Sequence, residues 1–578
     1  MRIPFLNALA AVLFTGAPVF PVSGQAIEGP GNKNWIMPVR IPVFLSGNFA
    51  EPRSNHFHSG IDIKTNGATG IPVYAVSSGS VSRIKVEPGG YGRALYIRHL
   101  DGFTSVYAHL QSFSGEVEKY VRAEQYRRES FAVDLFPEPA RFPVRQGDII
   151  ARTGNSGSSE GPHLHFEIRE TSSENPVNPL VKTITVKDQI PPVINQVYSF
   201  SLSGRQEWIK PVNHPVILKE GIYRLATSTP LPLDNISGLG IESWDLLDGS
   251  PNRCGVYRIQ GYLDGELFYD FMADEFSFAE TRYLNSFIDY KQYMTHDRTI
   301  LRLFIEPCNE LSLYRYSKNR GHLEVKDNKV HEVRLVVEDA AGNRSVALVP
   351  VSLNPSQFVH DPGFLPFYDA YFSAGETNVF TAEGVEIRIP ARALYDDIYF
   401  QYQASGPGPG CYSKIHSIHR QDVPLHQYYR LAIEATGLPA GLKNQAIIAC
   451  QGPGRKMIPS GGVWEGNFLV TRTRTFGQFY ICVDTLKPEI RPINFKNQED
   501  LNKVSSLRFD IRDDFSGIST YRGEVDDKWA LMEYHPKNNL LEYKLDPERI
   551  GTGKVHTFVL QVSDLLKNTT TYRTTFYR

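Results

Sequence analysis

The sequence contains few cysteines, little net charge and, after its first residues, no long hydrophobic run. A formal net charge of −2 provides no basic field, so nucleic acid is not an expected partner. No later segment is long and apolar enough to cross a bilayer, so no stable membrane span is expected. The chain also lacks a His-Glu-x-x-His motif, which excludes the common helix-borne zinc protease site.

The five cysteines are widely separated, and none has the spacing of a zinc-binding pair. They are Cys254, Cys308, Cys411, Cys450 and Cys482. A disulfide between Cys254 and Cys308, or between two of the last three, is one interpretation. Buried free thiols are the other.

A chain of 578 residues is too long for one hydrophobic core, which predicts several domains. Its 30 tyrosines and 33 phenylalanines, with frequent glycine and proline, favour β-structure. We therefore expect a mainly β fold, with an antiparallel-sheet domain followed by several β-sandwich (Ig-like) domains.

The first residues are typical of a secretory signal peptide. Arg2 precedes an apolar run at 5–14, and small residues follow at 22–26. Pro18 and Pro21 argue against a membrane anchor because they interrupt a segment that is already short. A signal peptide at 1–26 predicts an exported protein, located in the periplasm, in the cell envelope or outside the cell.

Residues 27–182 are predicted to form the first domain, with a core at about 50–180. Alternating strands are expected at 71–76, 80–86, 95–99 and 103–109. The Asp101-Gly102 pair is a hairpin signal between the last two strands, because glycine tolerates the positive φ of tight turns. The pattern therefore predicts an antiparallel sheet.

A charged stretch at 116–129 interrupts these strands with helix-forming residues, and prolines follow it. It predicts a helical insertion at about 115–143, with a return to strand at 144–150. A lid or a docking surface for substrate is one hypothesis for the insertion, and an ordinary surface segment is the alternative.

The rest of the chain repeats itself weakly. The paired positions are Asp188 with Asp484, Asp234 with Asp514, and Asp339 with Asp564. They predict Ig-like β-sandwiches at 183–353 and 484–578, separated by an all-β domain of unknown type at 354–483. The aspartates are interpreted as turn-capping residues, because calcium would need a denser oxygen cluster than the sequence displays.

Histidines with strand spacing are the main chemical signal of the first domain. His163 and His165 are two residues apart, so on a strand both project from one face, which Glu167 shares as a possible supporting residue. The intervening side chains, Leu164, Phe166 and Ile168, then point into the core.

His58 and Asp62 form the second half of this signal. On an extended strand they would be about 13 Å apart, too far to bind one ion. The chain must therefore bend, and Ser59-Gly60 is the natural place. Two imidazoles and a carboxylate at one point would make a three-ligand Zn²⁺ site with a position left for water, as hydrolases use.

With these motifs the domain resembles the M23 (lysostaphin/LytM-type) zinc endopeptidases, which cut peptide cross-links in bacterial peptidoglycan. The matching motifs are His58-x-Gly60-x-Asp62, residues 70–75 with Gly79-x-Val81, Tyr91-Gly92, Tyr107-Ala108-His109-Leu110, Gly147-Asp148, and Gly154-x-x-Gly157 leading into 161–167. The resemblance covers roughly 50–180. It implies that His58, Asp62 and His165 bind Zn²⁺ and that His109 and His163 are the catalytic pair outside the ligand set.

The resemblance implies an exported zinc metalloendopeptidase that hydrolyses peptide stems or bridges of peptidoglycan through a metal-activated water. One alternative is a non-catalytic LytM-type scaffold that binds cell wall or activates an amidase. Another is an adhesion or glycan-binding protein in which the β-domains dominate. The sequence identifies neither the bond cleaved nor a protein partner.

Overall fold

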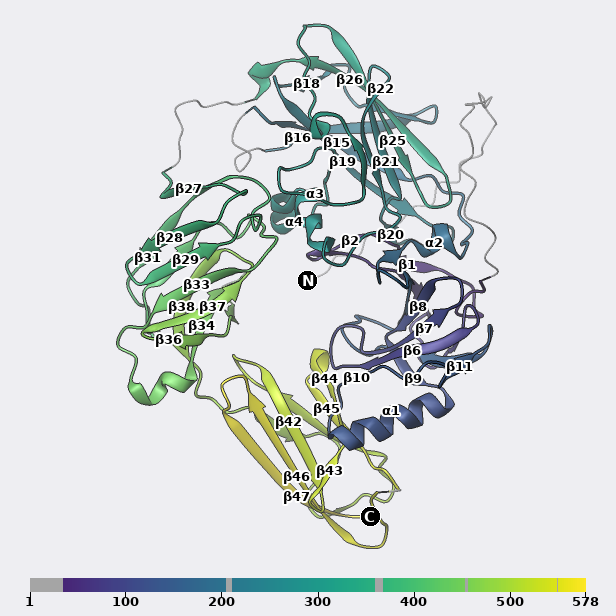
Figure 1. Cartoon of the computed structure of the whole chain (residues 1–578), viewed down its shortest axis with the longest axis vertical. Helices are drawn as coiled ribbons and strands as arrows, with labels where there is room; N and C mark the ends of the chain where they lie inside the picture. Colours follow the sequence, from purple (N-terminus) through teal and green to yellow (C-terminus); the bar gives the residue numbers. More distant parts are fainter. Residues whose placement is uncertain (1–34, 204–209, 359–366, 453–455, 548) are drawn as a thin grey trace. The chain divides into compact units, whose positions relative to one another are not determined.

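The computed structural model describes residues 35–203, 210–358, 367–452, 456–547 and 549–578 (Figure 1). Strands are the main element throughout, and the helices are few and mostly short. The prediction of a mainly β chain is confirmed. The predicted signal peptide at 1–26 lies outside the described residues. Among the described helices, none has the length and apolar character that a membrane crossing requires.

A large antiparallel sheet carries the first domain, with the strand order β1-β4-β13-β8-β7-β6-β10. The bounds are β1 Leu45–Gly47, β4 Ile61–Lys64, β13 His163–Glu170, β8 Phe103–Ala108, β7 Arg93–His99, β6 Gly79–Val86 and β10 Val133–Leu135. A smaller sheet has the order β5-β12-β9, with β5 Pro72–Tyr74, β12 Ile149–Thr153 and β9 Leu110–Phe113. The short strands are β2 Pro52–Arg53, β3 His56–Phe57, β11 Pro143–Val144 and β14 Pro176–Val177.

Strand alternation builds the core beneath β13 as the sequence predicts. Leu164, Phe166 and Ile168 are each 0% exposed and belong to the main hydrophobic core of this domain. Their neighbours along the strand therefore stand on the opposite face. The predicted hairpin joins β7 and β8, and Gly102 has a φ of +85°.

The segment predicted to be a helical insertion contains α1, Gly115–Arg128, which lies beside β9 and β10 (Figure 1). Val121 and Gln125 are the buried residues of this otherwise polar helix. The prediction of a continuous strand at 144–150 is wrong. A turn separates β11 from β12, because Gly147 has a φ of +85° and ends the extended conformation.

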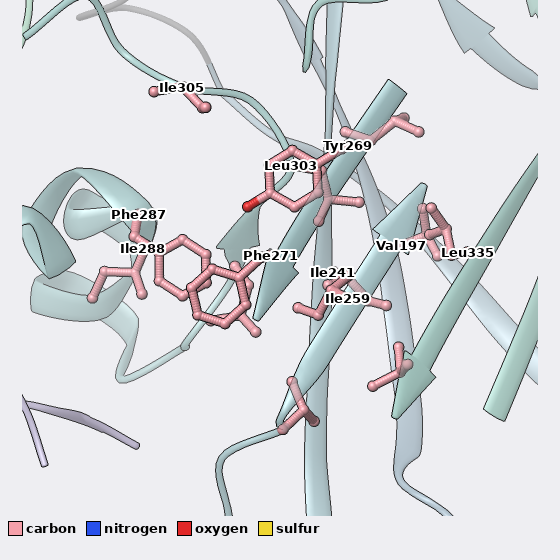
Figure 2. Packing of buried hydrophobic residues seen from close by; sticks show 14 of the residues in the cluster. Val197, Ile241, Ile259, Tyr269, Phe271, Phe287, Ile288, Leu303, Ile305 and Leu335 are labelled. Atoms are coloured by element: carbon pink, nitrogen blue, oxygen red, sulfur yellow. The ribbon is translucent and has the colours of Figure 1, made fainter. Parts of the chain in front are cut away.

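Among the described residues between 193 and 353, twelve strands form one connected sheet. Their bounds are β15 Val193–Ser201, β16 Val212–Lys219, β17 Ile222–Leu225, β18 Leu231–Leu233, β19 Ser237–Leu246, β20 Arg253–Cys254, β21 Arg258–Leu263, β22 Glu266–Met272, β23 Leu301–Arg302, β24 Tyr314–Ser317, β25 Val330–Glu338 and β26 Arg344–Leu353. The short helices are α2 Pro179–Lys182, α3 Leu284–Phe287 and α4 Tyr290–His296. Phe287 of α3 stacks on Phe271 of β22, with ring centroids 4.5 Å apart, and so joins the helix to the strand core (Figure 2).

Two five-stranded sheets and one strand pair follow at 370–483. One sheet contains β28 Asn378–Ala382, β29 Val385–Ile389, β33 Tyr429–Glu434, β37 Phe468–Thr473 and β36 Val463–Glu465. The other contains β31 Tyr402–Ser405, β32 Ile415–Ile418, β38 Gly477–Val483, β34 Ala446–Gln451 and β35 Met457–Pro459. The pair is β27 Ala370–Phe372 with β30 Ile398–Phe400.

All five cysteines are free thiols, so the structure has the free-thiol alternative and not the disulfides.

The last strands form two sheets that face each other. One contains β39 Glu489–Pro492, β41 Ser506–Arg512, β45 Leu540–Lys544 and β44 Met532–His535. The other contains β40 Glu499–Asp500, β47 Thr569–Tyr577, β46 Val555–Asp564, β42 Ile518–Val525 and β43 Lys528–Ala530. Phe509 of β41 stacks on Phe558 of β46, with ring centroids 5.3 Å apart. The apolar faces of both sheets therefore share one core.

Candidate active site

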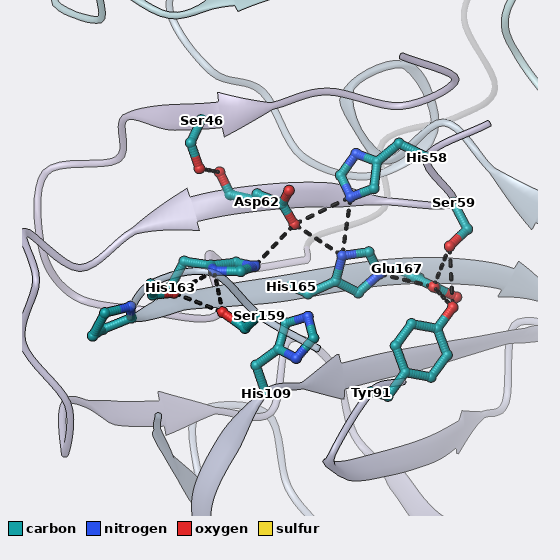
Figure 3. A network of polar contacts seen from close by, with 12 residues as sticks. Ser46, His58, Ser59, Asp62, Tyr91, His109, Ser159, His163, His165 and Glu167 are labelled. Carbon is teal, nitrogen blue, oxygen red and sulfur yellow. Dashed lines mark hydrogen bonds and ion pairs between the residues drawn. The ribbon is translucent and has the colours of Figure 1, made fainter. Parts of the chain in front are cut away.

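His58, Asp62 and His165 converge at one point in the first domain (Figure 3). Asp62 Oδ1 lies 3.1 Å from His58 Nε2 and 2.9 Å from His165 Nδ1. The two imidazole nitrogens are 3.0 Å apart. The exposed fractions of the three residues are only 7%, 8% and 4%, so these polar atoms are removed from bulk water.

Strand pairing and one bend bring the three side chains together. β4 and β13 are neighbours, and Asp62 stands directly opposite His165 in their register. His58 lies in the break between β3 and β4, where its spacing from Asp62 predicts a bend. The bend brings the backbone against β13, because a Cβ on Gly60 would lie 2.3 Å from the carbonyl oxygen of Phe166.

The outer nitrogens of both imidazoles have their own partners. His58 Nδ1 lies 2.8 Å from the carbonyl oxygen of Asn48, and His165 Nε2 lies 2.8 Å from Glu167 Oε1. We assign the ring protons to these two nitrogens, because both partners are acceptors. With both rings neutral, as metal binding requires, the inner nitrogens carry lone pairs that face each other and Asp62. A cation would accept all three electron pairs. A hydrogen-bond partner on the outer nitrogen of each histidine is typical of metal sites.

Glu167 is held in place by a buried polar network on the far side of His165. It is 0% exposed and accepts hydrogen bonds from Ser59 Oγ at 2.6 Å, from Arg169 Nε at 2.7 Å, and from the hydroxyl of Tyr91. Burial alone would raise the pKa of Glu167, but Arg169 and His165 hold it well below its usual range. The carboxylate therefore stays ionised and fixes the orientation of the His165 ring.

Asp62 is oriented by an arginine. Arg53 Nη2 donates to Asp62 Oδ2 at 3.1 Å, which directs Oδ1 toward the imidazoles. Burial would raise the pKa of Asp62, but the neighbouring imidazoles, His58 foremost, hold it well below its usual range. A permanently ionised carboxylate is the form that binds a metal.

His109 and His163 lie beside this cluster, with their ring centroids 4.8 Å apart (Figure 3). His109 sits between β8 and β9 with a φ of +57°, a conformation uncommon outside glycine and frequent at functional sites. Its Nδ1 lies 2.9 Å from the carbonyl oxygen of Ser156, which leaves Nε2 as the acceptor. Burial, with His165 and His163 nearby, lowers the pKa of His109 to about 3, so the ring is neutral.

His163 also donates through Nδ1 to a backbone carbonyl oxygen. Its Nδ1 lies 2.9 Å from the carbonyl oxygen of Gly161 and 3.2 Å from Ser159 Oγ. Its Nε2 is 3.3 Å from Asp62 Oδ1. The side chain is 17% exposed, more than that of either candidate histidine ligand. His163 is therefore an accessible imidazole at the edge of the cluster.

The structure brings all five predicted site residues together and adds residues that sequence reasoning missed. These are Asn48, Arg53, Ser156 and Arg169. Of these four residues, only Arg169 could have been predicted from the sequence. It follows Glu167 by two positions on β13 and therefore shares its face. The others lie on separate segments, and their approach depends on tertiary packing.

Comparison with known families identifies two parts of the chain. Residues 56–126 and 140–179 match the model of peptidase family M23. The gap between the two matched stretches falls within the predicted insertion. Residues 369–484 match the model of the Zu5-like domain, which gives a description to the all-β domain of unknown type.

The similar individual proteins match only part of the chain. The DD-carboxypeptidase/endopeptidase Mpg of Neisseria meningitidis serogroup B is 36% identical over 123 residues, which are 21% of this chain and 22% of that protein. Lipoprotein NlpD of Yersinia enterocolitica is 31% identical over 114 residues, which are 20% of this chain and 91% of that protein. A solved structure of a zinc-containing peptidase from Vibrio cholerae is 25% identical, covers 25% of this chain and 39% of that one, and has a TM-score of 0.19.

The family match covers every residue of the His-Asp-His cluster and both neighbouring histidines. It confirms the resemblance on which the sequence prediction rests. Through this first domain, the chain belongs to peptidase family M23.

Proposed function

We propose that this protein is an exported zinc metalloendopeptidase that hydrolyses peptide cross-links of bacterial peptidoglycan. The observation that carries the proposal is the convergence of two imidazole nitrogens and one carboxylate oxygen in a buried cluster. A relative named as a DD-carboxypeptidase/endopeptidase supports the reaction class. Other relatives are named as lipoproteins, which supports a location in the cell envelope or periplasm.

His58 Nε2, Asp62 Oδ1 and His165 Nδ1 would hold the Zn²⁺ ion. Two neutral imidazoles and one carboxylate are a donor set that catalytic zinc sites use. When bound, Zn²⁺ supplies an acidified water and polarises the scissile carbonyl. Glu167 and Asn48 keep the two rings in the tautomer that turns a lone pair inward.

His109 is placed to accept a proton. Its Nδ1 proton is committed to the carbonyl of Ser156, and Nε2 is the atom that can accept a proton from a nucleophilic water. His163 is placed to stabilise the developing oxyanion or to return a proton to the leaving amine.

A non-catalytic scaffold is the competing function. The relatives named as lipoproteins and not as peptidases favour it. The complete donor set, its outer partners and both additional histidines favour catalysis, because a scaffold needs none of them. We also propose that 183–353 and 484–578 are Ig-like domains that flank the Zu5-like domain, as the sequence repeats predict.

Mass spectrometry of muropeptides released from purified peptidoglycan tests the proposal. Wild type should release new peptide ends, and His109→Ala should release almost none while keeping one zinc per chain. His296→Ala is the matched control, because that histidine is exposed at the end of α4. Wild-type protein with one zinc per chain and no released product would establish the scaffold instead.

A further inference from the structure

Three aspartates that are distant in sequence meet outside the peptidase domain. Asp188 precedes β15, Asp245 lies near the end of β19, and Asp339 follows β25. One carboxylate oxygen of each lies within 4.8 Å of the other two. Asp245 and Asp339 are only 3% and 2% exposed, so the negative charges are concentrated in a place with little water.

Asp245 is paired on one side only, by a hydrogen bond from the backbone of Leu246. Its Oδ1 is buried and accepts no hydrogen bond. Among the described residues, no lysine, arginine or histidine forms an ion pair with any of the three aspartates. Burial, together with Asp339 and Asp188, raises the pKa of Asp245 to about 8. A buried carboxylate oxygen without a partner is costly, and a cation beside it would offset that cost.

The surrounding backbone holds the carboxylates together in spite of their repulsion. Asp339 Oδ1 accepts from the amides of Ala341 and Asn343, both at 2.9 Å. The side-chain amide of Asn343 donates to Asp339 Oδ2 at 2.7 Å and to the carbonyl oxygen of Asp188 at 3.3 Å. Turn capping therefore accounts for the burial of Asp339, as the sequence interpretation holds. It does not account for the burial of Asp245.

The last domain repeats this cluster. One carboxylate oxygen of each of Asp484, Asp513 and Asp564 lies within 4.8 Å of the other two. Asn568 takes the place of Asn343, since its side-chain amide donates to Asp564 Oδ2 at 2.6 Å and to the carbonyl oxygen of Asp484 at 2.9 Å. Beside the cluster, the backbone N–H of Ser516 donates to Asp484. The hydroxyl of Ser516 is buried and has no hydrogen-bond partner.

The two clusters occupy equivalent places in their strands. In each domain the first aspartate precedes the opening strand, and the third lies at the turn of a long closing hairpin, β25–β26 or β46–β47. The second lies at the end of the strand that pairs with the opening strand, β19 or β41. Asp245 is therefore the counterpart of Asp513. The sequence pairing of Asp234 with Asp514 is wrong, because Asp234 precedes β19 and Asp514 follows β41.

We propose that each aspartate cluster binds a Ca²⁺ ion, which goes beyond the peptidase function. The clusters offer only oxygen ligands, the type that calcium prefers and zinc does not. At the usual Ca–O distance of about 2.3–2.6 Å, opposite ligands are about 4.6–5.2 Å apart, which the spacing of these oxygens fits. Backbone carbonyls and water complete the coordination. The ion joins three chain segments at one end of each domain.

Calorimetric titration of CaCl₂ into the full, zinc-loaded chain in calcium-depleted buffer tests this proposal. Wild type should bind two Ca²⁺ ions, with dissociation constants in the range of about 10⁻⁴–10⁻³ M or tighter. Asp245→Asn and Asp513→Asn should each bind one ion, and the double variant none. Asp514→Asn is the matched control, because this exposed neighbour of Asp513 is outside the cluster and should leave two ions bound.

Thermal melting provides a second readout that does not depend on heats of binding. Calcium should raise the Tm of wild type. Without calcium, Asp245→Asn should melt at or above the wild-type temperature, because the neutral amide relieves the repulsion, and it should lose part of the calcium-dependent increase. Two ions bound to the double variant, no calcium binding by wild type, or equal affinity for Mg²⁺ would each overturn the proposal. Asp188→Asn repeats the test at a more exposed ligand.

Discussion

The peptidase centre and the aspartate clusters gather buried ligands in opposite ways. At the peptidase centre every ligand has a dedicated partner behind it, as Glu167 stands behind His165 and Arg53 behind Asp62. In the cluster around Asp245, one buried oxygen has no partner at all. Nitrogen donors with oriented rings suit zinc, whereas oxygen donors suit a larger cation that tolerates varied geometry. Asp339 also has outer hydrogen bonds, so the difference between the two kinds of site lies in the unpartnered oxygen of Asp245.

The largest expected effect is the loss of His165. His165→Ala removes one imidazole donor and leaves Asp62 and His58 without their third partner, so zinc binding and muropeptide release should fall to background. Metal analysis of the purified variant measures the first effect and mass spectrometry the second. Calcium binding by the same variant should remain at two ions. One zinc per chain in His165→Ala would remove this residue from the ligand set.

His109→Ala should separate proton transfer from metal binding. The rate of muropeptide release should fall by about 10²–10⁴-fold, the usual contribution of a positioned acid or base. The zinc content should stay at one per chain, because His109 is outside the ligand group. Steady-state rates with paired metal analysis provide the measurement. A parallel loss of zinc would show that His109 acts on the ligands instead.

Glu167→Gln tests the partner behind His165. The amide keeps the size of the side chain but cannot hold the ring through an ionised oxygen, so zinc affinity or activity should fall by about 10–100-fold. Competition with a chromophoric chelator measures the affinity. Glu170→Gln is the control, because that carboxylate lies on the same strand without contacting His165. Equal affinity in Glu167→Gln and wild type would contradict the assigned role.

The pH dependence of zinc binding follows from His165. Burial lowers the pKa of this imidazole in the absence of metal, but Asp62 and Glu167 raise it, with a net result of about 9. Zinc must therefore displace a proton at neutral pH, and its apparent affinity should rise about tenfold per pH unit until the pH reaches this pKa. In the metal-free protein the same shift stabilises the fold fully below the unfolded pKa of about 6.5, and this contribution is lost as the pH rises through about 9.

Titration of zinc into metal-free protein in buffers of different protonation enthalpy counts the protons released. Close to one proton at pH 7, and fewer above pH 9, is the expected result. Proton release that does not change across this range would exclude a protonated His165 in the metal-free state.

The smallest expected effect on peptidase activity is that of changing the two aspartate clusters. The double variant Asp245→Asn with Asp513→Asn should cleave short muropeptides at the wild-type rate, because neither residue touches the peptidase centre. Rates on soluble fragments, with zinc content as the control, test this independence. A large loss of activity at full zinc occupancy would show that the β-domains and the peptidase centre are coupled.

Much of the peptidase centre could be predicted because its residues lie close together along the chain. Residues two apart on a strand share a face, which placed His163 and His165 together and sent Leu164 into the core. The four-residue spacing of His58 and Asp62 required the bend that the structure shows before β4. The continuous strand at 144–150 failed because the positive φ of Gly147 outweighed the apolar pattern around it.

The sequence by itself determined the β character of the chain, the family of its first domain and the five side chains of the candidate active site. These depend on periodicity and on short motifs, which are local properties of the chain. Only the tertiary structure decided that Arg53 orients Asp62 and that Asp245 meets Asp188 and Asp339. The reason is that sheet pairing and hairpin packing bring together residues whose separation along the chain carries no periodic signal.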